Sequence, residues 1–126
     1  MKKFTTLIVD DEKDFLETLS ERFRLRGIPT KTALDGESAL NLIEENPPKI
    51  VILDVMMPGM GGLEILQRIK EQHPQITVIL LTGRGSTKDG IKGMQLGAAD
   101  YLMKPIDIEE LITKMNESVN RLYKIE

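Results

Sequence analysis

The chain has 126 residues, a net charge of -3 from 17 basic and 20 acidic side chains, and no cysteine. This length suits a single domain over residues 1–126, and because the basic residues are scattered, nothing favours binding to nucleic acid or to a membrane surface. The lack of cysteine excludes disulfides, zinc-thiolate sites and thiol nucleophiles, and it fits a reducing compartment, for which the cytoplasm is the default.

Short runs rich in β-branched residues alternate along the chain with segments of helical period. This alternation predicts a parallel sheet whose strands are joined by helices. The first run, about Thr5 to Val9, holds too short an apolar stretch for a signal peptide or a membrane span, and we interpret it as a strand. The helix after it is expected to place Phe15, Leu19 and Phe23 on one face and to stop at Gly27.

The second predicted strand, about Thr30 to Ala33, is less apolar and is expected at an edge of the sheet. The third, Ile50 to Leu53, is apolar on both faces, as expected of a central strand covered by helices on each side. The helix that follows the second strand is expected to end at Pro47, and the helix that follows the third strand is expected to stop before Pro74. Their buried faces are expected to be Ala39, Leu40 and Ile43 in the first helix and Leu63, Leu66 and Ile69 in the second.

The fourth predicted strand, Thr77 to Leu81, precedes a helix of about Ser86 to Leu96 that contains two glycines, Gly90 and Gly93. Each glycine costs roughly 1 kcal/mol relative to alanine in a helix interior. This helix is therefore expected to be the least stable of the chain.

The last predicted strand spans about Asp100 to Met103, and the final helix begins with Asp107 as N-cap and Glu110 at the third helical position, an aspartate-led capping box. Its apolar stripe comprises Ile108, Leu111, Ile112, Met115, Val119 and Leu122. Right-handed crossovers with helices on both faces predict a doubly wound α/β fold. Five parallel strands favour the flavodoxin-like (βα)5 arrangement with strand order 2-1-3-4-5 over the Rossmann-like one.

Five polar side chains stand where the apolar runs stop: Asp10, Asp11, Asp54, Thr82 and Lys104. The carboxyl ends of parallel strands meet at one rim of a sheet, where open α/β folds bind ligands. Carboxylates gathered there would take up protons or recruit a cation, because two unit charges ~4 Å apart repel by about 4 kcal/mol at an effective dielectric near 20. Oxygen ligands without imidazole or thiolate favour Mg²⁺, and Mn²⁺ should substitute.

A carboxylate opposite a metal ion can attack phosphorus, because the metal screens the negative charges of the phosphate. The Lys104 ammonium can then neutralise phosphate oxygens and the Thr82 hydroxyl can hydrogen-bond one of them. Simpler interpretations exist for single residues: Asp10 and Asp11 could only cap the first helix, and Thr82 could be an ordinary strand-end hydroxyl. The set as a whole predicts a site for a divalent cation and a phosphoryl group.

These residues lie in motifs that resemble the receiver domain of bacterial two-component response regulators, the CheY-like family. The motifs occur in the family's order and at its usual spacing, and the resemblance covers essentially the whole chain. They are Val9-Asp10-Asp11-Glu12, Leu53-Asp54-Val55-Met56-Met57-Pro58-Gly59-Met60-Gly61, Leu81-Thr82-Gly83 and Tyr101-Leu102-Met103-Lys104-Pro105.

The resemblance implies that Asp54 accepts a phosphoryl group from the phosphohistidine of a sensor histidine kinase or a histidine phosphotransfer protein, and also from small donors such as acetyl phosphate. It implies that Asp11 and Asp54 ligate Mg²⁺ directly with the main-chain carbonyl of Met56. Asp10 would bind the ion directly or through water. Thr82 and Lys104 would hold the phosphoryl oxygens.

The resemblance also implies how phosphorylation is read. Thr82 would move inward while Tyr101 rotates from exposed to buried, and the surface of the last two helices and the last strand would change shape for a downstream protein partner. The Lys104-Pro105 peptide bond is expected to be cis. Met56 and Arg84, each two residues beyond a site residue, are expected to set the lifetime of the phosphoryl group.

The leading interpretation is a phosphorylation-activated signalling switch that catalyses its own phosphorylation and slow dephosphorylation. A Mg²⁺-dependent phosphohydrolase with an aspartyl-phosphate intermediate is one alternative, although Val55 and Met56 stand where a second acid/base carboxylate would be wanted. An inert pseudo-receiver that only binds partners is another. A stand-alone receiver and the N-terminal part of a longer regulator both fit the sequence, as do a monomer and a phosphorylation-dependent homodimer.

Overall fold

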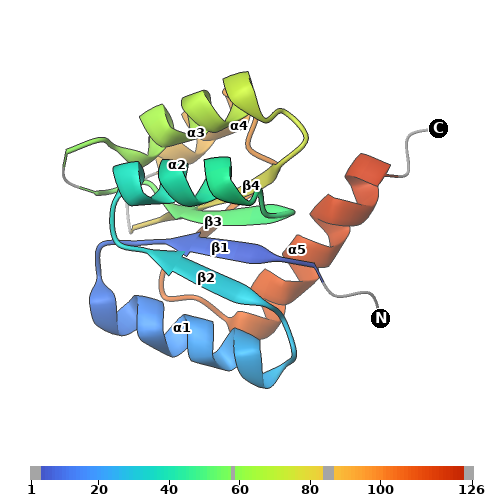
Figure 1. Cartoon of the computed structure of the whole chain (residues 1–126). Helices are drawn as coiled ribbons and strands as arrows, with labels where there is room; N and C mark the ends of the chain where they lie inside the picture. Colours follow the sequence, from blue (N-terminus) through green and yellow to red (C-terminus); the bar gives the residue numbers. More distant parts are fainter. Residues whose placement is uncertain (1–3, 58, 84–86, 124–126) are drawn as a thin grey trace.

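The structure is a computed structural model that describes residues 4–57, 59–83 and 87–123. Strands and helices alternate throughout the described residues, as the sequence predicts (Figure 1). The elements are β1 Thr6–Val9, α1 Lys13–Leu25, β2 Thr30–Ala33, α2 Gly36–Glu45, β3 Ile50–Asp54, α3 Gly62–Gln72, β4 Thr77–Thr82, α4 Thr87–Gln95, β5 Asp100–Met103 and α5 Ile108–Tyr123.

The strands form one parallel sheet in the order β2-β1-β3-β4-β5, which confirms the predicted flavodoxin-like order. β2 lies at an edge and β3 at the centre, as expected. Val9, the last residue of β1, is in register with Leu53 of β3, so the residues that follow both strands emerge side by side. Because every strand runs in the same direction, the carboxyl ends of the strands form a single rim.

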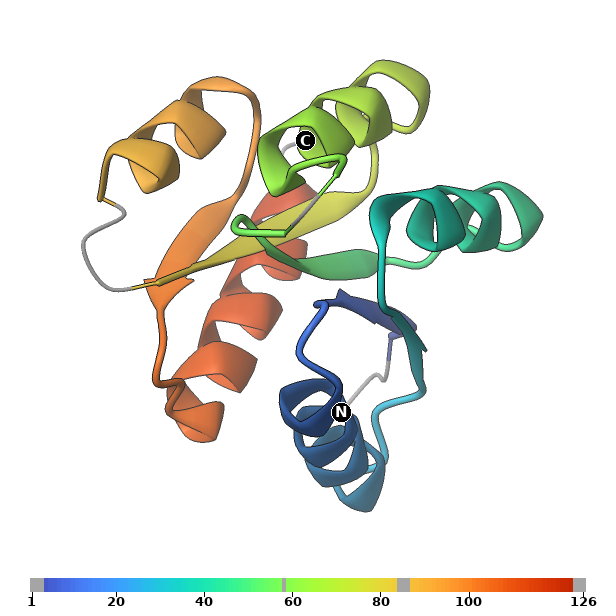
Figure 2. The same cartoon turned by 90° about the vertical axis from the view of Figure 1, so that its left-hand side faces the viewer.

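Helices cover both faces of this sheet. α1 and α5 lie on one face, and α2, α3 and α4 lie on the other (Figures 1 and 2). Successive residues of a strand point to opposite faces, so β3 contributes Ile50 and Ile52 to the core under α1 and α5, and Val51 and Leu53 to the core on the other side. All five residues of β3 are buried, as predicted for a central strand.

Three side chains that the sequence analysis placed on buried helix faces lie only at the margin of the core: Phe15, Leu40 and Leu63. The buried residues near two of them are Leu16, which follows Phe15, and Ile65, which comes two residues after Leu63. For Phe15 the reason is geometric, because its predicted face is spaced strictly by four, and residues so spaced drift about 40° per step around a helix of 3.6 residues per turn. Leu16, Leu19 and Phe23, with spacings of three and four, stay on one stripe.

The last helix largely follows its prediction. Asp107 Oδ1 accepts hydrogen bonds from the backbone amides of Glu109 at 2.9 Å and Glu110 at 3.3 Å, which confirms the predicted cap. The Lys104–Pro105 peptide bond is cis, as expected. Leu111, Met115 and Val119 are buried, Ile108 and Ile112 pack at the edge of the core, and the side chain of Leu122 lies outside the described residues.

The glycines of α4 have a packing role that the sequence analysis did not anticipate. A side-chain carbon at Gly90 would lie 2.6 Å from two ring carbons of Tyr101. A side-chain carbon at Gly93 would collide with the side chain of Leu80. The two glycines therefore let α4 lie close against β4 and β5. The low stability expected of this helix stays a prediction.

None of the helices within the described residues is long and apolar enough to cross a membrane.

Candidate functional site

Three acidic residues lie together at the carboxyl ends of β1 and β3, as the sequence analysis predicted. Asp10, Asp11 and Asp54 each bring one carboxylate oxygen to within 4.8 Å of the other two. Asp10 and Asp54 are buried, whereas Asp11 is exposed. The register of β1 and β3 explains the gathering, because it places the residues after Val9 beside the end of β3.

The buried position of Asp54 has an electrostatic consequence. Burial, and then the charge of Asp10, raise the pKa of Asp54 to about 6, against the opposing effects of Lys104 and the Met56 amide. That amide donates to Asp54 Oδ1 at 3.4 Å. A buried carboxylate whose ionised form is this unfavourable, with two further carboxylates close to it, suits a hard cation with oxygen ligands. The donor set therefore fits Mg²⁺ or Mn²⁺, held by Asp10, Asp11 and Asp54.

Lys104 brings the cationic side chain of the site. Its Nζ lies 2.8 Å from Asp10 Oδ2, 2.7 Å from Glu12 Oε1 and 3.8 Å from Asp54 Oδ2. It also stands 4.3 Å from the centroid of the Phe15 ring. Burial lowers the pKa of the Lys104 ammonium, but its hydrogen bonds to Asp10 and Glu12 outweigh burial and leave the pKa above its usual value. The ammonium therefore stays charged and close to Asp54.

Thr82 contacts β5, and Tyr101 of β5 contacts α4. Thr82 is the fully buried last residue of β4, and its hydroxyl donates to the carbonyl of Leu102 at 3.4 Å. The Thr82 carbonyl accepts a hydrogen bond of 2.8 Å from the Lys104 amide. Tyr101 precedes Leu102 on β5, and its partly buried ring lies against Gly90 of α4. A movement of Thr82 would thus reach β5 and α4 through direct contacts.

Of the two residues expected to set the phosphoryl lifetime, Met56 lies among the described residues. Met56 lies two residues after Asp54, the last residue of β3, and the residue is 61% exposed. Arg84 lies outside the described residues.

Two features of the rim were not found by sequence analysis. Glu12 contacts Lys104 although the two residues are far apart in the chain, and it occupies the N-cap position of α1. Asp10 Oδ1 accepts from the Glu12 amide at 2.9 Å, so part of the capping interpretation holds, but neither aspartate is the N-cap itself. A side chain at Gly62 would collide with the Asp54 carbonyl, so this glycine lets α3 begin directly beside the site.

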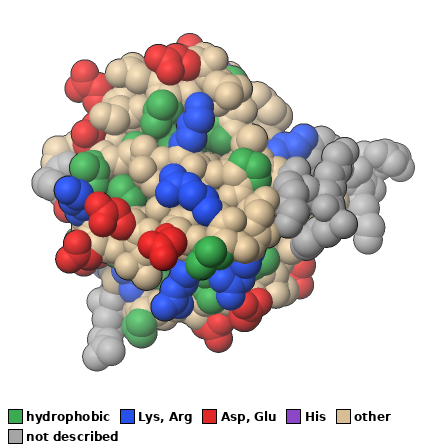
Figure 3. Space-filling model, turned by 60° about the horizontal axis from the view of Figure 1, so that its bottom comes forward, with side chains coloured by type: hydrophobic (Ala, Val, Ile, Leu, Met, Phe, Trp, Pro, Cys, Tyr) green, Lys and Arg blue, Asp and Glu red, His purple; other side chains and the backbone are tan. Residues whose placement is uncertain are grey.

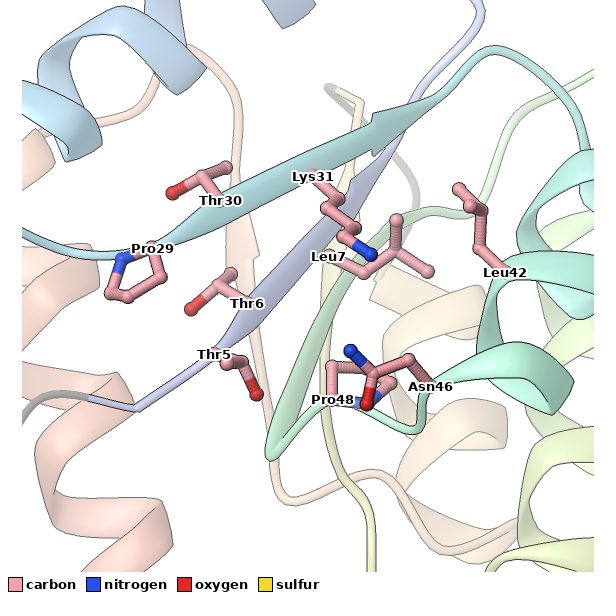
Figure 4. Close-up of a pocket in the computed structure, with 9 residues that line it drawn as sticks. All are labelled: Thr5, Thr6, Leu7, Pro29, Thr30, Lys31, Leu42, Asn46 and Pro48. Carbon is pink, nitrogen blue, oxygen red and sulfur yellow. The ribbon is translucent and has the colours of Figure 1, made fainter.

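A cavity of about 200 Å³ lies at the other end of the sheet (Figure 4). Its walls are the starts of β1 and β2, the last part of α2 and the segment between α2 and β3, with no acidic residue among the described residues that line it. They are Thr5, Thr6, Leu7, Pro29, Thr30, Lys31, Leu42, Asn46 and Pro48. This cavity therefore lacks the acidic cluster that marks the rim.

Charged side chains are mixed on the surface that comes forward in Figure 3. Acidic and basic groups alternate there with apolar ones. This distribution agrees with the small net charge of -3.

Comparison with known proteins connects this geometry to a family. A family model described as the response regulator receiver domain matches residues 6–116. The probable transcriptional regulatory protein TcrX of Mycobacterium tuberculosis is 38% identical over 117 residues, which cover 93% of this chain and 50% of that protein. This chain therefore spans half the length of that curated relative.

Solved structures agree in fold. The receiver domain of the Francisella response regulator 1452 is 35% identical with a TM-score of 0.86, covering 94% of this chain and 98% of that one. NtrX from Brucella abortus is 31% identical with a TM-score of 0.91, and the similarity covers 97% of this chain but 28% of that one. The match over residues 6–116 shows that the chain belongs to the response regulator receiver domain family of two-component systems.

Proposed function

We propose that this receiver domain is a phosphorylation-activated switch and that Asp54 accepts the phosphoryl group. The donor would be the phosphohistidine of a sensor histidine kinase or a histidine phosphotransfer protein, with small phosphodonors such as acetyl phosphate as substitutes. The observation that carries the proposal is the position of Asp54, a buried carboxylate within 4.8 Å of two others and 3.8 Å from the Lys104 ammonium.

In the transfer, an Asp54 carboxylate oxygen forms a bond to phosphorus while the phosphorus–nitrogen bond of the phosphohistidine breaks. The imidazole leaves with the electron pair of that bond. Lys104 neutralises a phosphoryl oxygen as charge moves between the two groups, because its ammonium stands beside Asp54 and stays protonated. Asp10, Asp11, Asp54 and the main-chain carbonyl of Met56 would hold Mg²⁺, which when bound supplies further charge neutralisation.

The response to phosphorylation would begin at Thr82. Its hydroxyl donates to the Leu102 carbonyl, and it must exchange this bond for one to a phosphoryl oxygen. Loss of this bond changes the packing at Leu102, next to Tyr101, whose ring lies against Gly90 of α4. The surface formed by α4, β5 and α5 is therefore the part that would change shape and be read by a downstream protein or by an output segment of a longer chain.

The residues after Asp54 favour the switch over a dedicated phosphohydrolase. Val55 is buried and Met56 carries an exposed thioether, so neither supplies an acid or base to water. Slow dephosphorylation fits this environment, and Met56 and Arg84 are proposed to set its rate. The complete set of rim residues disfavours an inert pseudo-receiver. A cytoplasmic location, and a monomer or a phosphorylation-dependent homodimer, stay predictions.

Incubation with acetyl phosphate and Mg²⁺, followed by intact-mass spectrometry, tests the proposal. A mass increase of one phosphoryl group that persists for minutes and is absent in Asp54→Asn supports the switch. Rapid release of phosphate without accumulation supports the hydrolase, and no modification supports the inert module. Asp14→Asn is the matched control, because it removes an exposed carboxylate from the first turn of α1 and should be phosphorylated normally.

A further inference from the structure

Glu12 occupies the N-cap position of α1, but its side chain does not cap the helix. Glutamate is a poor N-cap residue compared with serine, threonine, aspartate or asparagine. The Glu12 side chain accepts no capping hydrogen bond among the described residues of α1. It instead accepts a hydrogen bond of 2.7 Å from Lys104 Nζ. The side chain at this position is therefore used by the site and not by the helix.

The contact has a geometric consequence for Lys104. An ammonium has three hydrogen-bond donors, and here one serves Asp10 at 2.8 Å and another serves Glu12 at 2.7 Å. The distance from Nζ to Asp54 Oδ2 is 3.8 Å, which is beyond hydrogen-bond length. To hold a phosphoryl oxygen on Asp54, the ammonium must turn a donor away from its present direction and toward Asp54. The bond to Glu12 restrains that movement.

Asp10 cannot play the same part as Glu12. Asp10 is fully buried and belongs to the acidic cluster that suits a cation, whereas Glu12 is exposed and lies outside that cluster. The Glu12 side chain can thus leave Lys104 for water without uncovering a buried charge. It is the partner that Lys104 can most easily exchange for a phosphoryl oxygen.

We propose that Glu12 is a positioning residue that holds Lys104 back from Asp54 and so slows phosphorylation until the ammonium is released. The inference rests on the proposed function, because it concerns the rate at which Asp54 is phosphorylated. The reach of the side chain matters as much as its charge. Aspartate is shorter by one carbon–carbon bond of about 1.5 Å, which places its carboxylate beyond hydrogen-bond distance of Nζ.

Three variants separate restraint from charge. Glu12→Gln keeps the shape and removes the charge, and Glu12→Asp keeps the charge and removes the reach. Exposed ion pairs contribute up to about 1 kcal/mol, so both variants are expected to be phosphorylated by acetyl phosphate about twofold to fivefold faster than wild type. Asp14→Asn removes a neighbouring exposed charge that has no ion pair among the described residues, and its rate should match wild type.

The opposite pattern would overturn the proposal. If Glu12→Asp keeps the wild-type rate while Glu12→Gln and Asp14→Asn both accelerate phosphorylation, the effect belongs to the electrostatic field and not to the contact. Slower phosphorylation of both Glu12 variants would mean that Glu12 places Lys104 productively, which also contradicts the inference.

A second measurement does not depend on phosphorylation. Ammonium protons in hydrogen bonds exchange slowly with water, so the Lys104 ammonium should give an NMR signal in wild type that broadens in Glu12→Gln and Glu12→Asp. If the wild-type protein accepts no phosphoryl group while the Lys104 NMR signal still depends on Glu12, that result contradicts the proposed function but supports the restraint of Lys104 by Glu12. If wild type is phosphorylated normally, and both Glu12 variants keep the wild-type Lys104 NMR signal and phosphorylation rate, the restraint by Glu12 is contradicted and the proposed function is not.

Discussion

Asp54 should destabilise the metal-free protein at neutral pH, because the site favours its uncharged form. The Asp54 side chain is 5% exposed, and burial and the charge of Asp10 raise the pKa of Asp54 from its ordinary value of 3.8 to about 6. Asp54→Asn removes the ionisable group while keeping its size and hydrogen-bonding shape. This variant is therefore expected to be more stable than wild type at pH 7.

The magnitude follows from the pKa shift. A rise of roughly two pKa units corresponds to about 3 kcal/mol of free energy of unfolding. Solvent at the open rim reduces this value, so we expect Asp54→Asn to gain about 1 to 2 kcal/mol. The sign also fixes the pH window. Between the unfolded pKa near 4 and the folded pKa near 6 the folded chain binds more protons, so wild-type stability falls as pH rises through this window.

Urea unfolding in the presence of a chelator, at several pH values from 4 to 7, measures both effects. The two proteins should have similar free energies of unfolding near pH 4 and diverge by pH 7. Asp14→Asn, an exposed carboxylate of α1, serves as the control and should follow wild type. If Asp54→Asn is no more stable than wild type at pH 7, or shows the same pH dependence, the electrostatic description of the site is wrong.

Other predictions concern the backbone around the site. Gly62→Ala should lower the free energy of unfolding by about 1 to 3 kcal/mol, since its new carbon would lie 2.6 Å from the Val55 Cα. Gly61→Ala, with no described atom within 4 Å of the added carbon, should cost less, since only the preference for glycine at the N-cap of α3 is lost, and equal urea midpoints for the two variants would contradict the packing argument. Asp107→Ala should cost about 1 kcal/mol in urea unfolding by loss of the α5 cap, and an unchanged midpoint would count against that cap. Gly90→Ala should displace the Tyr101 ring, visible as shifted tyrosine ring resonances by NMR, and unshifted resonances would refute the contact.

Most of the fold could be predicted from the sequence because its signals are local. Strand and helix periods, together with proline at helix ends, defined the elements, and the parallel arrangement then implied a common rim. The gathering of Asp10, Asp11 and Asp54 follows from that topology alone. No knowledge of individual side-chain contacts was needed to expect it.

The parts that were missed depend on contacts between distant residues. Glu12 and Lys104 are separated by 92 positions, and no local pattern pairs them. Gly90 and Gly93 suggested only a weak helix, because their close approach to the sheet depends on how α4 packs. Phe15 was placed too deep because a spacing of four residues alone does not follow the helical period.

The central claim is that Asp54 itself carries the phosphoryl group. An acyl phosphate is reduced by borohydride to an alcohol, which converts a phosphorylated aspartate to homoserine. After reaction with acetyl phosphate and Mg²⁺, borohydride reduction and peptide mass spectrometry should find homoserine at position 54, and it should be absent when the donor is omitted. Homoserine at Asp10 or Asp11 instead, or a phosphorylated protein with no reduced residue at position 54, would contradict the claim.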